Sequence, residues 1–400
     1  MHVLIVTDQH PDSLGGAQVA IRAQRAALER GGLTVTIAAP ARAQGDDGHD
    51  PGVISLPSRP ITRDREYTLS WPGARTDRRL ATALRGRPPV DLVHLEGDFW
   101  GALIGLRAAR GLRVPVVHTL HNNVDEGTRA VTPLAPAVFW ALRWWRRLTL
   151  GRPRGAVAER ARGAWRYLAE LAAEAAVVTA PSRHFADTLE RRGVAERVEV
   201  TRGGIDDAAV AALRGEPRAE RPRPHLVWLG RMSAEKRVLE LLDAFALARV
   251  DADLTLYGAG LLLPQVEARI VTLNLSDRVH LAGPVPHAAA LRAIHQADAL
   301  LQTSIGFETQ GLTPFEAALL GTPTVFCDPA IAADAAVTPS WLAADARTAS
   351  LADALRAAVS DLAARPGEVR VPWDAARDFL QSVQTEHLLR QYARALTAGR

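Results

Sequence analysis

Strand-like and helix-like segments alternate along almost the whole chain, and this pattern restricts the possible fold more than any other feature. The apolar segment His2–Thr7 is followed by Ala17–Arg30, which has helical periodicity and ends at two glycines, and then by the apolar segment Leu33–Ala39. Because glycine commonly ends a helix, the three segments are typical of a β-α-β unit. Near-continuous apolar strands joined by helices predict a parallel sheet covered on both faces.

The same pattern returns in the first half of the chain and then starts again as a second series. The first half adds the segments Asp91–Glu96, Trp100–Arg110, Val114–Leu120, Ala175–Ala180, His184–Arg192 and Val198–Thr201. The second series has predicted strands at His225–Leu229, Asp253–Tyr257, Arg278–Leu281, Ala299–Thr303 and Thr324–Cys327. Its predicted helices are Glu235–Ala248, Leu262–Asn274, Ala288–Gln296 and Leu312–Leu320. Two such series predict two similar α/β domains.

The length and one polar stretch indicate where the two domains divide. A chain of 400 residues suits two domains of about 200 residues each. The stretch Asp206–Pro224 is rich in proline and arginine, which is typical of an interdomain linker. The segment Trp373–Leu396 has the pattern of one long amphipathic helix with no strand after it. We therefore predict one domain from residues 1–205 with the C-terminal helix 376–400, and a second from residues 206–375.

The composition argues against several classes of protein. The apolar residues at the start indicate a strand rather than a secretory leader, and no apolar run approaches the roughly 18 residues that span a bilayer. A single cysteine, Cys327, leaves no internal disulfide and no cysteine-histidine zinc pattern, and a net charge of +4 does not indicate a nucleic-acid partner. The acidic pair Asp251 and Asp253 precedes its strand, so it lies at the wrong edge of the sheet for a metal site. We expect a cytoplasmic protein that needs no metal or other cofactor.

Ligands of open α/β sheets bind outside the carboxyl ends of the strands, so the residues that follow the strands are candidates for a site. In the first series these are Asp8, His10, Gly15, Gly16, His121 and Asn122. In the second series they are Gly230, Arg231, Lys236, Gly258, Gly260, Ser304, Glu308, Gly311 and Glu316. Gly258 and Gly260 lack the third glycine of a dinucleotide-binding motif.

Several of the second-series residues suit a diphosphate. Arg231 and Lys236 supply cations, and the amides near Gly311, Leu312 and Thr313 supply free donors at the start of a helix. Lys236 is the only lysine in the chain, which has 48 basic residues in all. Lysine and arginine are not interchangeable at phosphate sites, which favours a function for Lys236. The alternative is that both cations belong to a solvated helix start.

The carboxylates and the first-series residues suit a sugar. Glu308 and Glu316 can each accept two hydroxyl hydrogen bonds from a ribose or hexose diol. Glu316 could instead only balance the helix dipole. His121 could be a structural histidine, and His118 competes with it from the opposite face of the strand. The pair Gly15 and Gly16 could be a loose turn, but its place before a helix favours the close approach of a ligand.

One segment, Phe139–Leu150, combines tryptophan with arginine. Its candidate residues are Trp140, Arg143, Trp144, Trp145, Arg146 and Arg147. An amphipathic helix with tryptophan and arginine suits the surface of an anionic membrane. The alternative is a surface helix that packs on its own domain by its aromatic face.

With these residues in place, the chain resembles the family 4 retaining glycosyltransferases of the GT-B fold over nearly its whole length. The segment Gly306–Val325 (GFETQGLTPFEAALLGTPTV) is similar to the family's E-x7-E signature and the G-T-P that follows it. Leu226–Lys236 resembles the segment in which G-R is followed by a lysine, here five positions after the arginine, and Asp253–Gly260 resembles the strand and G-x-G turn. Val177–Leu189 and Thr201–Asp206 resemble the end of the N-terminal domain.

The resemblance implies a fold and a set of roles. The fold would be two facing Rossmann-like domains with a cleft between them and a C-terminal helix that crosses back to the N-terminal domain. The N-terminal domain would bind the acceptor and the C-terminal domain the nucleotide sugar. Arg231 and Lys236 would neutralise the diphosphate, Glu308 would contact the transferred sugar and Glu316 the ribose. Gly16, beside Gly15, would approach the diphosphate and acceptor, and His121 would face the sugar near the reacting carbon.

The reaction implied is the transfer of a hexose from a donor of the GDP-mannose or UDP-glucose type to an acceptor hydroxyl, with retention of configuration. The sequence E-T-Q-G at Glu308–Gly311 departs from the common E-G-F-G and resembles members that glycosylate membrane lipids. This favours a glycolipid acceptor and a place at the inner face of the plasma membrane, with a soluble glycan or a small thiol precursor as the alternative acceptor. Two other functions stay open: a GT-B-shaped sugar-nucleotide epimerase, and a non-catalytic basic protein that binds anionic surfaces.

Overall fold

The computed structural model describes residues 1–13, 15–42, 50–61 and 67–398, and these form two compact units. Unit 1 contains residues 1–204 and 381–400, and unit 2 contains residues 205–380. The last segment changes unit at Leu380 rather than at residue 375, because Ile205 forms a bridge with Leu380 and its N–H donates to the carbonyl of Phe379. No helix among the described residues is long and apolar enough to cross a bilayer.

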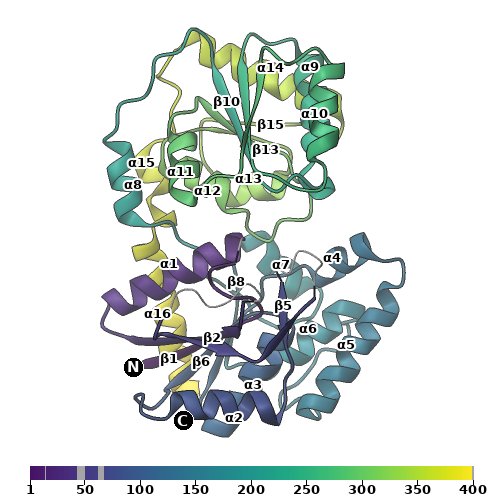
Figure 1. Cartoon of the computed structure of the whole chain (residues 1–400), viewed down its shortest axis with the longest axis vertical. Coiled ribbons are helices and arrows are strands. Elements are labelled where there is room, and N and C mark those ends of the chain that lie inside the picture. The colour runs from purple at the N-terminus through teal and green to yellow at the C-terminus, as the bar shows by residue number, and fades with distance from the viewer. Residues whose placement is uncertain (14, 43–49, 62–66, 399–400) are drawn as a thin grey trace. The chain divides into compact units, whose positions relative to one another are not determined.

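Unit 1 contains a seven-stranded parallel sheet with the order β3-β2-β1-β6-β7-β8-β9 (Figure 1). The strands are β1 (His2–Thr7), β2 (Thr34–Pro40), β3 (Val53–Leu56), β6 (Leu92–Glu96), β7 (Val116–Thr119), β8 (Val177–Ala180) and β9 (Glu199–Val200). A separate antiparallel pair is formed by β4 (Ser58–Pro60) and β5 (Thr68–Ser70). The parallel β-α-β pattern predicted for the first half of the chain is therefore confirmed.

The helices of unit 1 cover both faces of this sheet. They are α1 (Gly16–Arg30), α2 (Ala74–Leu84), α3 (Trp100–Leu112), α4 (Val124–Val131), α5 (Ala135–Leu150), α6 (Gly163–Ala172), α7 (Arg183–Arg191) and α16 (Gln381–Ala398). Alternate residues of a strand point to opposite faces. Val3 and Ile5 accordingly join the core that includes α1 and α16, whereas Leu4 and Val6 join the core that includes α3, α5 and α6.

Unit 2 contains a six-stranded parallel sheet with the order β12-β11-β10-β13-β14-β15. The strands are β10 (His225–Leu229), β11 (Asp253–Tyr257), β12 (Val279–Gly283), β13 (Ala299–Gln302), β14 (Thr324–Phe326) and β15 (Ser340–Leu342). The helices are α8 (Asp207–Arg214), α9 (Val238–Ala248), α10 (Leu263–Thr272), α11 (His287–His295), α12 (Leu312–Leu319), α13 (Pro329–Ala335), α14 (Thr348–Ala364) and α15 (Trp373–Ala376), with 3₁₀ helices η1 (Ala234–Lys236) and η2 (Arg377–Phe379). Leu226 and Trp228 face the core that includes α9 and α14, and Val227 faces α11 and α12.

Both sheets have the strand order of a Rossmann-like fold. In each unit the first strand lies between the second strand of the unit and a later one: β1 between β2 and β6, and β10 between β11 and β13. Such a reversal of the strand order leaves a crevice at the carboxyl ends of the central strands, where α/β proteins bind their ligands. The fold therefore predicts one ligand-binding edge in each unit.

Three predicted segments contain a helix or a break that the sequence analysis did not predict. The predicted linker Asp206–Pro224 begins with α8, because the Asp206 side chain caps the amide of Ala209 at 2.8 Å and Val210 and Leu213 bury an apolar stripe. The predicted helix Glu235–Ala248 is divided into η1 and α9. The division lies at Arg237, whose backbone is left-handed (φ 52°).

The predicted C-terminal helix Trp373–Leu396 is likewise three elements, α15, η2 and α16. The break lies at Leu380, whose backbone is extended (φ −63°, ψ 144°). This break is also where the chain passes from unit 2 to unit 1. Only α16 packs on the sheet of unit 1, where it contributes Leu388, Tyr392 and Ala395 to the core.

Candidate active site

Two loops meet at the carboxyl edge of the unit 2 sheet, and glycines allow them to do so. The amide of Gly230 donates to the carbonyl of Tyr257 at 3.1 Å, and that of Met232 donates to the carbonyl of Ala259 at 2.9 Å. A Cβ atom added to Gly258 would lie 1.9 Å from the Gly230 carbonyl oxygen. The G-x-G turn therefore serves the packing of the loops after β10 and β11.

Lys236 lies in η1, immediately after this loop, and its ammonium forms an ion pair with Glu308 Oε1. Ser304 Oγ donates to the same carboxylate oxygen at 3.1 Å, and the Lys236 carbonyl accepts from Thr303 Oγ1 at 2.5 Å. Both charged side chains stay partly accessible, at 26% and 15% of their surface. The structure thus brings together the predicted lysine and the predicted carboxylate, which lie 72 residues apart in the chain.

The N-terminus of α12 lies after Glu308. Gly311 is its N-cap residue with φ 69°, and no side chain caps the helix. Leu312 and Thr313, the first residues of α12, are half-buried. An uncapped helix start presents free amide donors and the positive end of the helix dipole. This end of α12 is therefore suited to an anion.

Glu316 lies one turn into α12 and is 4% exposed. Its Oε1 lies 2.6 Å from Nε2 of His287, the first residue of α11. Burial and a specific partner argue against a role limited to the helix dipole, since such a carboxylate would lie in solvent. The sequence analysis missed His287, because it is the first residue of a helix and does not directly follow a strand. Arg231 is exposed in the loop after β10.

In unit 1, the Asp8 carboxylate lies beyond the end of β1. It accepts hydrogen bonds from the amides of Asp98, Phe99 and Gly101 at 2.6, 3.1 and 2.7 Å, where α3 begins. Burial, followed by the nearby charge of Asp98, raises the pKa of Asp8 to about 6, although the three amides oppose this. Through these hydrogen bonds Asp8 stabilises the turn before α3.

Asp98 stabilises the loop that contains His121 through hydrogen bonds. Its Oδ2 accepts from the amides of His121 and Asn122 at 3.0 and 2.8 Å, and from Asn122 Nδ2 at 2.7 Å. His118, the competitor of His121, is fully buried, and its Nε2 lies 2.9 Å from the Gly97 carbonyl oxygen. His118 is therefore structural.

The His121 ring lies against a carboxylate that the sequence analysis did not single out. Its Nε2 hydrogen-bonds Glu96 Oε2, at the end of the neighbouring strand β6. Burial would raise the pKa of Glu96, but His94 and His121 outweigh it and lower that pKa to about 2. Burial would lower the pKa of His121, but Glu96, with Asp98 and Asp8, raises it. The signal that was available is the sequence Glu96-Gly97-Asp98, directly after a predicted strand.

Gly15 and Gly16 lie at the start of α1. Gly15 is the N-cap residue and Gly16 begins the helix, which has no capping side chain and no acidic residue in its first turn. The structure therefore gives this helix start the open amides that close approach of a ligand needs. Residue 14 lies outside the described residues.

The residues proposed for membrane contact divide into exposed and buried ones. Trp140 and Trp144 are 66% and 53% exposed and stack with ring centroids 6.3 Å apart. Arg147 is exposed, and Arg143 is half-buried and paired with Glu170 at 3.0 Å. Trp145 is half-buried, with its ring centroid 5.1 Å from that of Trp71.

The prediction for Arg146 is wrong. Arg146 is fully buried, pairs with Glu174 at 2.8 Å and donates to the Gly151 carbonyl at 2.7 Å. It points inward because α5 packs on unit 1 by the face that includes Phe139 and Leu150. Arg146 therefore stabilises the fold and cannot contact a surface.

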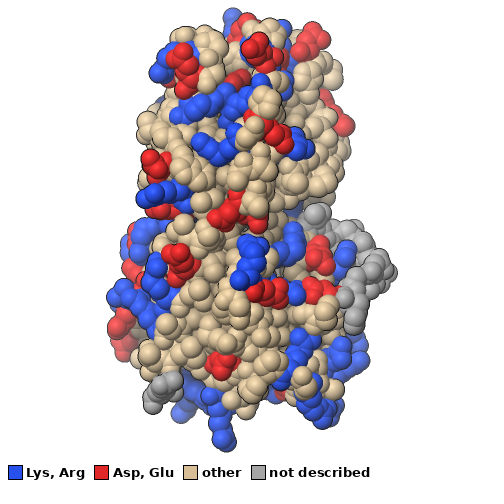
Figure 2. All heavy atoms as spheres, turned by 90° about the vertical axis from the view of Figure 1, so that its left-hand side faces the viewer, with Lys and Arg blue, Asp and Glu red and all other residues tan. Residues whose placement is uncertain are grey.

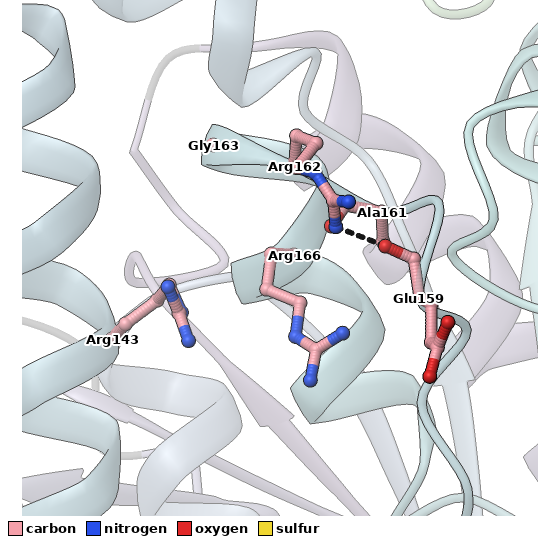
Figure 3. Close-up of a pocket in the computed structure, with 6 residues that line it drawn as sticks. All are labelled: Arg143, Glu159, Ala161, Arg162, Gly163 and Arg166. Atoms are coloured by element: carbon pink, nitrogen blue, oxygen red, sulfur yellow. Dashed lines mark hydrogen bonds between the residues drawn. The ribbon is translucent and has the colours of Figure 1, made fainter.

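A pocket of about 470 Å³ lies beside the two exposed tryptophans, and its lining includes Arg143, Arg147, Arg152 and Arg166. An adjoining pocket of about 370 Å³ has Arg143 on one side and Glu159 on the other, with Arg166 between them (Figure 3). On the face of the molecule drawn in Figure 2, by contrast, arginines and acidic residues form mixed patches. In the part of the chain that the structure describes, no group of three or more histidine, cysteine or acidic side chains is arranged to hold a metal ion.

Two family models match the chain. One, described as Glycosyltransferase Family 4, matches residues 14–209, and the other, described as Glycosyl transferases group 1, matches residues 223–361. Together they cover most of unit 1 and most of unit 2.

Three relatives are similar over most of their length. The 2-deoxystreptamine glucosyltransferase of Streptomyces kanamyceticus is 31% identical, over 74% of this chain and 74% of its own. The alpha-monoglucosyldiacylglycerol synthase of Streptococcus pneumoniae is 23% identical, over 81% of this chain and 70% of its own. The phosphatidyl-myo-inositol mannosyltransferase of Mycobacterium leprae is 26% identical, over 97% of this chain and 95% of its own.

Solved structures show the same fold. Anabaena HepE in complex with UDP and glucose is similar with a TM-score of 0.66 at 17% identity, over 98% of this chain and 99% of that one. Two Rossmann-like units, together with the two family models, define a glycosyltransferase of the GT-B fold that uses nucleotide sugars. This chain belongs to family 4 of the glycosyltransferases.

Proposed function

We propose that the chain transfers a hexose, with retention of configuration, from a nucleoside-diphosphate hexose to a hydroxyl group of a membrane lipid. The observation that carries the proposal is the ion pair of Lys236 with Glu308 beside the uncapped start of α12. This arrangement offers a cation, amide donors and a sugar-binding carboxylate at one edge of one sheet.

The diphosphate of the donor would lie against Lys236, Arg231 and the amides at Gly311, Leu312 and Thr313. Breaking the bond between the sugar and the diphosphate places growing negative charge on the leaving group. Stabilising this charge with prearranged donors is commonly the largest single contribution to catalysis. No step of this proposal requires a metal ion.

The two carboxylates would position the donor. Glu316 would accept hydrogen bonds from the ribose hydroxyls through the oxygen that His287 does not hold, and His287 would keep the carboxylate in place. Glu308 would exchange its contact with Lys236 for the hydroxyls of the hexose as the diphosphate takes over the ammonium. Orienting the reacting carbon in this way lowers the entropic cost of the reaction.

The chemistry would proceed on one face of the sugar. The bond from the anomeric carbon to the diphosphate oxygen breaks, the acceptor oxygen bonds to the same face of that carbon, and the diphosphate takes the acceptor's proton. This route gives retention without an enzymic nucleophile. A covalent glycosyl–enzyme adduct trapped on the protein would contradict it.

For the donor we propose UDP-glucose ahead of GDP-mannose. Two of the three relatives are named for glucosyl transfer and one for mannosyl transfer, and the Anabaena protein was solved with UDP and glucose.

For the acceptor we propose a lipid, because α5 offers a surface suited to a membrane. Trp140, Trp144 and Leu148 follow each other at four-residue spacing and are 66%, 53% and 65% exposed. The side chains of Arg147 and Arg152 make no hydrogen bond or ion pair with any described residue, so their charges are available to anionic headgroups. The protein would work at the inner face of the plasma membrane. The 31% identical relative is named for a small acceptor, so a small polyol is the competing class.

The test is a transfer assay with UDP-glucose and GDP-mannose, each offered with diacylglycerol-containing anionic vesicles, with 2-deoxystreptamine, or with no acceptor. The proposal predicts a glycosylated lipid in the vesicle arm, formed from UDP-glucose. A product formed only with the small acceptor would overturn the lipid assignment, and an epimerised nucleotide sugar without acceptor would overturn the transfer itself.

A further inference from the structure

Glu96 is a buried carboxylate that the mechanism above does not use. It ends β6 and is 6% exposed, and His121 follows the neighbouring strand β7. The register of the two strands pairs Leu95 with His118, which brings the residues beyond them to the same edge. Glu96 Oε2 hydrogen-bonds His121 Nε2, and Oε1 accepts from Gln24 Nε2 at 3.0 Å.

This contact determines which nitrogen of His121 is available. Nε2 is occupied by Glu96, whereas Nδ1 makes no hydrogen bond with any described residue. The His121 side chain is 17% exposed, so the ring is partly accessible to solvent. Its Nε2 is hydrogen-bonded to the buried Glu96. Its backbone is held separately, through the bond from the His121 amide to Asp98.

Helices on one face of the sheet hold Glu96 in turn. Gln24 belongs to α1, and Tyr392 of α16 places its hydroxyl 2.8 Å from His94 Nδ1. His94 Nε2 lies 2.7 Å from Thr119 Oγ1 and 3.2 Å from Glu96 Oε1. The carboxylate is therefore enclosed by side chains of β6, β7, α1 and α16.

We propose that Glu96 is a positioning residue for His121, holding Nε2–H so that Nδ1 is presented to the hexose of the donor. This inference rests on the proposed function and on the role that the family resemblance implies for His121, which is to face the transferred sugar. A carboxylate that holds one histidine nitrogen sets the orientation and the tautomer of the ring. With Nε2–H held by Glu96, Nδ1 would accept a hydrogen bond from a sugar hydroxyl in the neutral ring and donate one to a sugar oxygen in the protonated ring.

The charges around the ring agree with this role. The groups that face His121 are the carboxylates of Glu96, Asp98 and Asp8, with His94 and His118 behind them. Burial lowers the pKa of His94 despite the nearby Glu96. The pKa of Glu96 is lowered by His94 and His121, and Glu96, Asp98 and Asp8 raise that of His121 despite its burial.

The first test measures the ring without any turnover. The imidazole of His121 is followed by NMR from pH 5 to 9 in the full chain with labelled histidine, and its signal is assigned by its loss in His121→Ala. In Glu96→Gln we expect the pKa of His121 to fall by about one to three units, the usual effect of removing an adjacent carboxylate. Glu267→Gln, an exposed change on α10, should leave it unchanged. An unchanged pKa in Glu96→Gln would overturn the inference.

The second test asks whether the contact matters to the reaction. We expect Glu96→Gln to lower kcat by about 10- to 100-fold at pH 7.5 with less change in the KM for the donor, as is typical when the partner of a functional histidine is lost. In the His121→Ala background the same change should have almost no further effect. Losses that multiply, or a lower pKa with an unchanged kcat, would reduce Glu96 to a structural role and overturn the proposal.

The two tests separate this inference from the proposed function. If the native chain transfers no hexose, the proposed function fails, while the NMR titration still decides whether Glu96 controls His121. If Glu96→Gln does not fold, Glu96→Asp retains the charge and withdraws it by one methylene group. That variant should show a smaller fall in both the pKa of His121 and kcat, and no change in either would contradict the proposal.

Discussion

Lys236 is the residue on which the proposed donor site depends most. It is the only lysine in the chain, and its ammonium reaches a carboxylate 72 residues further on, which no solvated helix start would do. A compact ammonium and a planar guanidinium present different donors to a diphosphate. Removing the positive charge of Lys236 and replacing its ammonium by a guanidinium should therefore have different effects.

We expect Lys236→Ala to lower kcat/KM for the nucleotide sugar by about 100-fold or more, because a prearranged charge on the leaving group is lost. Lys236→Arg retains the charge but not the geometry, so its loss should be intermediate. Steady-state kinetics over a range of donor concentrations measure both. Arg292→Ala, which removes an exposed cation of the same unit, should change little, and an equal loss there would contradict a specific role for Lys236.

Glu96 also affects the stability of unit 1. Its pKa is lowered from 4.5 to about 2 in the folded chain, so its ionised form stabilises unit 1 above pH 4.5, and this contribution is lost as the pH falls toward 2. The shift corresponds to about 3 kcal/mol. We expect Glu96→Gln to be less stable than the native chain at pH 6, with the difference shrinking as the pH falls below 4.5. Urea unfolding at pH 6, 4.5 and 3.5 measures this, and a difference that grows toward acid would contradict the assignment.

At the scale of elements, the loops after β10 and β11 depend on glycine. Gly258 has φ 130°, and a Cβ there would lie 1.9 Å from a backbone oxygen that cannot move aside alone. We expect Gly258→Ala to destabilise unit 2 by about 2 kcal/mol or more. Gly283→Ala is the matched control, because Gly283 also has a positive φ (70°) but nothing within 4 Å of the added carbon, and it should cost about 1 kcal/mol. Thermal unfolding measures both variants. Equal losses of stability would show that the contact with the Gly230 carbonyl oxygen is not the cause.

Helix α5 presents exposed tryptophans that we expect to contact the membrane. We expect the double variant Trp140→Ala/Trp144→Ala to bind anionic vesicles about tenfold more weakly or worse, because both rings lose apolar burial at the interface. Co-sedimentation with vesicles that contain anionic lipid measures it. The control is Leu261→Ala, which removes an apolar side chain of unit 2 that is 93% exposed. Undiminished vesicle binding by the double variant would contradict a role for α5 in membrane contact.

At the scale of the whole molecule, the sequence predicted both parallel sheets because buried parallel strands are continuous apolar segments. It missed β15, whose three residues lie at the sheet edge and are not buried. It also missed α14, an alanine-rich helix of 17 residues that lies beyond the last predicted strand. The unit boundary at Leu380 depends on a backbone bridge to Ile205, a contact that no local pattern shows.

The site was predictable where one residue is chemically distinctive and follows a strand, as Lys236, Glu308 and Glu316 do. The partners Glu96 and His287 could not be predicted in the same way. Glu96 reaches His121 only because β6 and β7 are neighbours in register, and His287 reaches Glu316 only because α11 packs near α12. Arg146 was assigned to the surface because the helix period alone does not say which arginine faces inward.

The measurement that tests the central claim most directly is the binding of UDP and GDP to the native chain, Lys236→Ala, Glu316→Ala and the control Glu267→Gln by titration calorimetry. The account predicts binding of one nucleotide to the native chain and the control, and binding at least about tenfold weaker in both site variants, since each loses a charged contact. Equal affinity in all four proteins, or no binding to the native chain, would contradict a donor site at the carboxyl edge of unit 2.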